Sequence, residues 1–131
     1  MSYQFEYQEK AGYLYVHVLG ERTQDAVISL TRELSQKAIE RGFTRILVDV
    51  RELKGWLQVM ESNYIVTTEF PKFRGSGLKR AAILDREPAE PQRWSFFETV
   101  AQNRGFELRV FTELDLARQW LLEGLNLQAS T

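Results

Sequence analysis

Hydrophobic and polar residues alternate at the start of the chain in the manner of a β-strand. Tyr3, Phe5 and Tyr7 alternate with polar residues over positions 3–8, and a mostly apolar stretch follows at 13–19. Alternation with period two is typical of a strand with one buried face, and the short glycine-containing gap between the two stretches favours a hairpin. The chain is therefore predicted to open with two antiparallel strands.

Four later segments have apolar residues at the three-to-four-residue spacing of amphipathic helices. They cover about 24–41, 56–70, 92–104 and 113–123. Thr23 is placed to cap the start of the first of them, and Gly42 is placed to end it in the left-handed conformation. These helices are expected to pack their apolar faces on a sheet.

Three further strands are predicted between these helices, at 45–50, 78–84 and 106–111. The first of them is apolar on both faces, which is typical of a central parallel strand. The element order is then β-β-α-β-α-β-α-β-α, and strands joined through helices imply right-handed parallel crossovers. The predicted fold class is α/β, with a mixed, mostly parallel sheet covered by helices and an antiparallel edge from the opening hairpin.

Composition narrows the range of functions. The 131 residues predict a single domain over 1–124 followed by a flexible tail at 125–131. Cysteine is absent and histidine occurs once, which excludes thiolate chemistry and multi-histidine metal centres, so no cofactor is expected. The net charge of −1 argues against nucleic-acid binding. No leader and no apolar run of about 20 residues is found, so no membrane span and a cytoplasmic location are expected.

Two segments carry a family resemblance that spans about residues 3–123. They are Arg-Ile-Leu-Val-Asp-Val-Arg-Glu-Leu-Lys-Gly-Trp at 45–56 and Phe-Phe-Glu-Thr-Val-Ala-Gln-Asn-Arg-Gly at 96–105, and 110–112 and 117–121 fit as well. The chain resembles bacterial STAS domains, the fold of anti-sigma-factor antagonists, and more closely the SpoIIAA-like proteins, which have some similarity to the lipid-binding CRAL-TRIO fold. The resemblance implies a fold more firmly than an activity.

The sequence departs from the regulatory STAS domains at one informative place. Those domains carry an Asp-Ser-Ser/Thr-Gly motif after the third strand, and phosphorylation of its serine switches partner binding. The matching stretch here is 50–57, and no serine or threonine occurs from Arg45 through Glu61. The phosphorylation switch therefore has no acceptor at that position, and no functional residue is carried over from it.

Acidic residues end two of the predicted parallel strands, where open α/β sheets tend to bind ligands. Asp49 with Arg51 follows one strand, and Asp85 follows another. If adjacent strand ends bring the two aspartates within reach of one another, they could perform acid–base chemistry or hold a divalent cation. The simpler interpretation is that both are turn residues in contact with solvent.

Aromatic residues supply a second candidate site. Trp56, Tyr64 and Phe97 belong to a group that could line an apolar pocket between helices and sheet. The simpler interpretation is ordinary core packing, because small cores use a large aromatic area.

Three functional hypotheses follow. The first is a non-enzymatic binding or regulatory module whose partner is another protein or a second copy of itself in a homodimer. The second is a carrier of a lipid-like or small apolar ligand. The third is an enzyme that uses Asp49 and Asp85.

Overall fold

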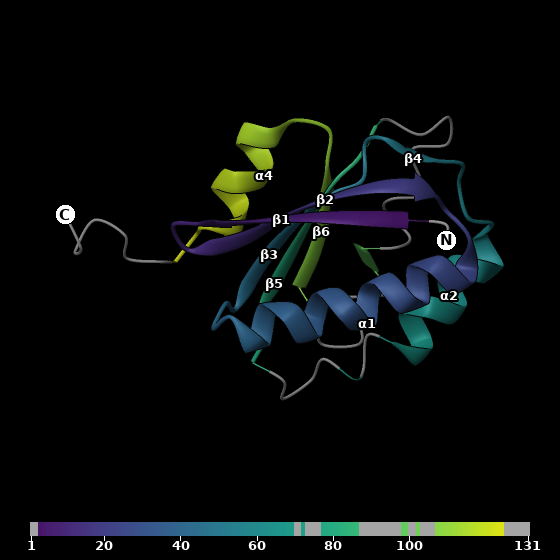
Figure 1. The fold of residues 1–131 in the computed structure, drawn as a ribbon, viewed down its shortest axis with the longest axis horizontal. Helices are drawn as coiled ribbons and strands as arrows, with labels where there is room; N and C mark the ends of the chain where they lie inside the picture. Colours follow the sequence, from purple (N-terminus) through teal and green to yellow (C-terminus); the bar gives the residue numbers. More distant parts are fainter. Residues whose placement is uncertain are drawn as a thin grey trace.

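A mixed sheet of six strands lies at the centre of the computed structural model, which describes residues 3–69, 72, 77–86, 98–99, 102 and 107–124. The strands are β1 (Tyr3–Lys10), β2 (Tyr13–Glu21), β3 (Arg45–Asp49), β4 (Leu53–Lys54), β5 (Arg80–Leu84) and β6 (Glu107–Phe111). Their spatial order is β1-β2-β3-β5-β6, and the short β4 pairs with β2 beyond the end of β3. Only the β1–β2 pair is antiparallel within the described sheet, which confirms the predicted fold class (Figure 1).

Helices cover both faces of this sheet. α1 (Gln24–Glu40) and α2 (Val59–Thr68) pack side by side on one face, and α4 (Leu114–Leu121) packs on the other against β3, β5 and β6 (Figure 1). The predicted cap of α1 is confirmed, because the Thr23 hydroxyl accepts a hydrogen bond from the Ala26 backbone N–H at 3.1 Å. Gly42 follows the helix with a φ of 79°, the left-handed conformation that favours glycine.

The core consists of two apolar clusters, one on each face of the sheet. Alternate residues of β3 divide between them: Ile46 and Val48 join the cluster under α1 and α2, whereas Leu47 joins the cluster under α4. Because β3 needs apolar side chains on both faces, its sequence shows no alternation. The two-sided burial also fixes the direction in which each residue near the strand's end points.

Two arginines bind backbone carbonyls at the carboxyl end of α4. Arg45 is buried, and its Nη1 donates to the carbonyl oxygens of Leu121 and Glu123 at 2.6 and 2.5 Å. Arg80 donates to the carbonyl oxygen of Trp120 at 2.7 Å. Arg45 thus supplies a donor to the last carbonyl of the helix, Arg80 adds a side-chain donor to a Trp120 carbonyl that also accepts from the Glu123 backbone N–H at 3.2 Å, and both arginines place positive charge at the negative end of the helix.

The structure differs from the sequence-based expectation after β3. The predicted helix at 56–70 begins only at Val59, because the preceding residues form β4 and a turn at Gly55, where φ is 80°. β4 itself was missed, since two residues are too few to show a periodicity. The predicted helix at 92–104 falls largely outside the described residues, within which Glu98, Thr99 and Gln102 are helical, and the predicted tail at 125–131 lies outside them as well. No described helix is long and apolar enough to cross a membrane.

Candidate functional site

The carboxyl end of the parallel strands brings together Asp49 and the residues that bind its side chain. Asp49 is the last residue of β3, and its carboxylate is almost completely buried. It accepts hydrogen bonds from the Tyr15 hydroxyl at 2.6 Å and from the Arg51 guanidinium at 3.0 and 2.8 Å, and Arg51 also donates its backbone N–H at 3.2 Å. Every donor is supplied by the protein itself.

The electrostatics of this cluster keep both acidic groups in a single protonation state at neutral pH. Burial alone would raise the pKa of Asp49, but the hydrogen bonds from Arg51 and Tyr15 outweigh it and hold this pKa below its ordinary value. Burial raises the pKa of Tyr15 to about 12, and the hydrogen bond to Asp49 contributes to the same shift. An ionised Asp49 and a neutral Tyr15 are the opposite of groups poised to exchange protons near pH 7.

Asp85 has an arginine partner of its own. It follows β5, is buried, and receives both terminal nitrogens of Arg22 at 3.0 and 3.3 Å. The Arg22 side chain is itself largely buried at the end of β2. This second carboxylate is therefore neutralised independently of the first.

The two predicted carboxylates lie on neighbouring strands but point to opposite faces of the sheet. Asp49 has the same orientation along β3 as Leu47, which packs under α4, whereas Asp85 continues the orientation of Ile83, which packs against the α1–α2 cluster. In the register of β3 and β5, Asp49 is paired with Leu84 rather than with Asp85. Asp85 is therefore one residue out of step with Asp49, and its side chain points to the other face. The structure thus brings the two backbones together but engages the side chains with different partners.

Trp56 lies between two arginines, Arg22 and Arg86, rather than in an apolar pocket. The guanidinium carbons of Arg22 and Arg86 lie 4.6 and 4.7 Å from the centre of its indole ring. Arg86 also donates to the carbonyl oxygens of Leu53 at 2.5 Å and Gly55 at 3.2 Å. The segment between β3 and α2 is consequently held in place by two cations.

Three large exposed apolar side chains lie on the layer formed by α1 and α2, two on α2 and one near the end of α1. Met60 and Tyr64 lie one turn apart on α2, and their exposed fractions are 82% and 52%, while Ile39 on α1 is 42% exposed. The other large exposed apolar residue of the described chain is Leu116, which lies on α4 across the sheet. Of the predicted aromatic site, Tyr64 thus faces solvent, and Phe97 lies outside the described residues.

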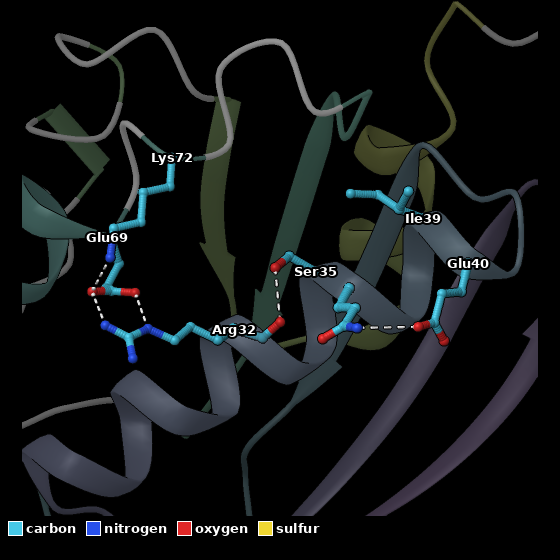
Figure 2. Close-up of a pocket in the computed structure, with 7 residues that line it drawn as sticks. Arg32, Ser35, Ile39, Glu40, Glu69 and Lys72 are labelled. Carbon is cyan, nitrogen blue, oxygen red and sulfur yellow. Dashed lines mark hydrogen bonds and ion pairs between the residues drawn. The ribbon is translucent and has the colours of Figure 1, made fainter.

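An open groove of about 420 Å³ runs along α1 beside the end of α2. Figure 2 shows Arg32, Glu69 and Lys72 at one end, and Ile39 and Glu40 at the other. Glu69 is buried, and its carboxylate receives two nitrogens of Arg32 at 2.8 and 3.1 Å and the Lys72 ammonium at 3.2 Å. The hydrogen bond from Arg32 is the main cause that lowers the pKa of Glu69, so this buried carboxylate is ionised at neutral pH.

Sequence reasoning missed several of these contacts. Arg22 pairs with Asp85, 63 positions away in the sequence, and Arg32 pairs with Glu69, 37 positions away. His17 pairs with Glu52, 35 positions away, at 2.5 Å. No local spacing signals such contacts. A buried glutamate at the end of α2 could have been suspected only from its helical phase. No group of three or more potential metal ligands occurs in the part of the chain that is described.

The model of one protein family, SpoIIAA-like, matches residues 13–122. A search of curated proteins finds no match.

Two solved structures show the same fold. An uncharacterised protein of the DUF3478 family with a SpoIIAA-like fold, from Shewanella loihica PV-4, has a TM-score of 0.53 at 21% identity, over 92% of this chain and 93% of that one. An anti-sigma factor antagonist from Mycobacterium paratuberculosis has a TM-score of 0.56 at 14% identity, over 93% and 96% of the two chains. At these identities the likeness extends to the fold alone.

Proposed function

The chain belongs to the SpoIIAA-like family, and from that premise we propose that it is a non-enzymatic regulatory module that binds a protein partner through the layer of α1 and α2. One observation carries the proposal: three of the four large exposed apolar residues in the described chain, Ile39, Met60 and Tyr64, lie on this layer. Exposed apolar side chains that gather on one face are typical of interaction surfaces.

The state of the buried carboxylates supports a binding role over an enzymatic one. Asp49, Glu69 and Asp85 are each paired with arginine, and the pKa values of Asp49 and Glu69 are lowered. A general acid or base for neutral pH needs a pKa shifted toward 7, whereas the pKa values of Asp49 and Glu69 are shifted away from 7. The opposite orientations of Asp49 and Asp85 also disfavour a shared reaction centre.

A protein partner fits the surface better than a small apolar ligand does. Two guanidinium groups lie over the Trp56 ring, and Tyr64 is more than half exposed, so neither lines an enclosed apolar site. The groove beside α1 is open, whereas small-molecule sites bury most of their ligand. A helix layer with exposed apolar side chains and an open groove is instead typical of a surface that binds another protein.

The regulation of this module must differ from a serine switch in the segment between β3 and α2. No serine or threonine is present from Arg45 through Glu61. Arg86 donates to two backbone carbonyls in that segment and lies over Trp56, so the segment already has a fixed cationic support. We expect partner binding without phosphorylation there.

Photo-crosslinking in the native host tests the proposal. A benzoylphenylalanine placed at Tyr64 should crosslink to one defined protein, and the product should disappear when excess unlabelled wild-type chain is added. The same group at Leu116, an equally exposed apolar position on α4, is the matched control and should give no such product. Competition by a Met60→Lys, Tyr64→Lys double variant should fail. Equal crosslinking from both positions, or none from Tyr64, would refute the proposal, and a crosslink to a second copy would assign the surface to self-association.

A further inference from the structure

We infer that the groove between α1 and the end of α2 binds a carboxylate-bearing, partly apolar segment of the protein partner. This inference rests on the proposed function and specifies which chemistry the partner presents. Its basis is a pair of cations at one end of the groove, Arg32 on α1 and Lys72 after α2, and the exposed apolar side chain of Ile39 beside Glu40 at the other end (Figure 2).

The charge at the Arg32 end of the groove favours an acidic group. Arg32 and Lys72 each have a side chain more than half exposed, whereas Glu69 between them is 4% exposed. At this end, two cations and one buried anion leave a net local charge of +1 facing solvent, whereas the carboxylate of Glu40 lies at the other end of the groove and makes its four charged lining residues neutral in sum. A carboxylate is the side-chain group that complements such a site through charge-assisted hydrogen bonds.

Glu69 acts as the positioning residue of this cation pair. It accepts two hydrogen bonds from Arg32, through Nε and Nη2, and one from Lys72. Both long side chains are thereby fixed at the mouth of the groove, while the remaining Arg32 nitrogen and the other Lys72 protons can face an incoming carboxylate. Fixing flexible side chains before binding reduces the entropy lost when the partner arrives.

The Arg32 end of the groove adjoins α2. Tyr64 lies on α2 five residues before Glu69, whose carboxylate binds Arg32 at this end of the groove. The helix that leads to the cation pair therefore also carries the exposed Tyr64 side chain.

The length of the groove sets the spacing of the two recognised groups. Arg32 and Ile39 are seven residues apart on α1, which corresponds to about 10 Å along the helix axis. A peptide in the polyproline II conformation has three residues per turn and rises about 3.1 Å per residue, so side chains three residues apart lie on the same face and span about 9 Å. The matching minimal probe is a blocked tetrapeptide, acetyl-Glu-Ala-Ala-Leu-amide.

Titration of the ¹⁵N-labelled protein with this tetrapeptide tests the inference. The expected result is saturable shifts of the backbone signals of Arg32, Ser35, Ile39 and Lys72. Replacing the peptide's glutamate with glutamine should weaken binding by about fivefold or more, and so should Lys72→Ala. Arg118→Ala removes the same charge from an exposed position on α4 and should leave binding unchanged. High salt should weaken binding as well.

Three outcomes would overturn the inference: no saturable shift, shifts centred elsewhere, or equal binding of the glutamate and glutamine peptides. Two further results distinguish a failure of this inference from a failure of the proposed function. If crosslinking at Tyr64 identifies a partner while the peptide does not bind the groove, only the acidic chemistry is wrong. If the peptide binds as expected while Tyr64 captures no protein, the groove recognises carboxylates but the layer is not a protein interface.

Discussion

The substitution Asp49→Asn tests whether the Asp49 carboxylate has a structural role or a functional one. The Asp49 side chain is 3% exposed and receives hydrogen bonds from Tyr15 and from both the backbone and the guanidinium of Arg51. Asparagine has nearly the same volume, so it leaves no cavity, but it removes the charge and one of the two acceptor oxygens. The cost should therefore come from electrostatics and hydrogen bonding alone.

The expected magnitude follows from what happens to each partner. Removing one member of a fully buried ion pair costs about 3–5 kcal/mol, because the other charge is left without a partner. The Arg51 side chain is 45% exposed and recovers contact with water, which reduces the cost. Tyr15 keeps an acceptor in the asparagine amide oxygen. We expect Asp49→Asn to lower the free energy of unfolding by about 2 kcal/mol at pH 7.

Urea denaturation at several pH values provides the assay. The pKa of Asp49 is lower in the folded protein than in the unfolded chain, so its contribution is complete above the unfolded value and is lost as pH falls through the folded value. The difference between wild type and Asp49→Asn should thus shrink below about pH 4.

The matched control is Asp115→Asn, which changes an 86% exposed aspartate paired with Arg118 on α4. It should cost less than about 0.5 kcal/mol. If Asp49→Asn costs no more than this control, or if its effect persists unchanged at pH 3, the assignment of Asp49 as a buried structural anion is wrong. Crosslinking at Tyr64 should survive in Asp49→Asn.

Three further substitutions test other contacts. Tyr15→Phe should remove the part of the alkaline instability that arises between pH 10 and 12, because the folded state raises the pKa of Tyr15 from 10.0 to about 12 and favours the neutral phenol. An alkaline unfolding series that is the same for wild type and variant would contradict this. Arg86→Met should lower the free energy of unfolding by about 1–2 kcal/mol and speed backbone hydrogen exchange at 51–57, since it removes the donors to the Leu53 and Gly55 carbonyls. Unchanged exchange would show that Arg86 does not hold the segment between β3 and α2 in place. Glu69→Gln should lower the urea midpoint and weaken binding of the glutamate tetrapeptide, because Arg32 and Lys72 lose the anion that positions them. The substitution also makes the local charge more positive, so tighter binding would show that charge alone recruits the peptide.

Local sequence patterns were sufficient for most of the sheet and for α1. The alternation at 3–8 and the doubly apolar stretch at 45–50 predicted an edge strand and a central strand, and both are observed. Thr23 and Gly42 marked the ends of α1 within one or two residues, because caps depend on neighbouring backbone groups. The start of α2 was placed too early, since the pairing of β4 with β2 competes with the helix for residues 53–54.

The candidate site was predictable only in part. Asp49 and Asp85 were correctly placed at the ends of adjacent parallel strands, but the register pairs Asp49 with Leu84 and turns the two side chains to opposite faces. The acid–base site that their adjacency could have formed, the lesser of the two interpretations, is not what these side-chain orientations favour. The groove at Arg32, Glu69 and Lys72 was missed entirely, because its charged residues come from α1 and from the chain after α2.

The amino-acid sequence by itself determined the opening hairpin, α1, the two-sided burial of β3 and the absence of a phosphate acceptor at 45–61, because each of these depends on residue identity or on neighbours within one or two turns. The tertiary structure alone decided which charges meet. Arg22 reaches Asp85 and Arg32 reaches Glu69 only because packing of the helices and strands brings distant segments within 3 Å. Hydrogen bonds and ion pairs act over a few ångströms of space whatever the separation along the chain, so the surfaces they build emerge only when the fold is complete.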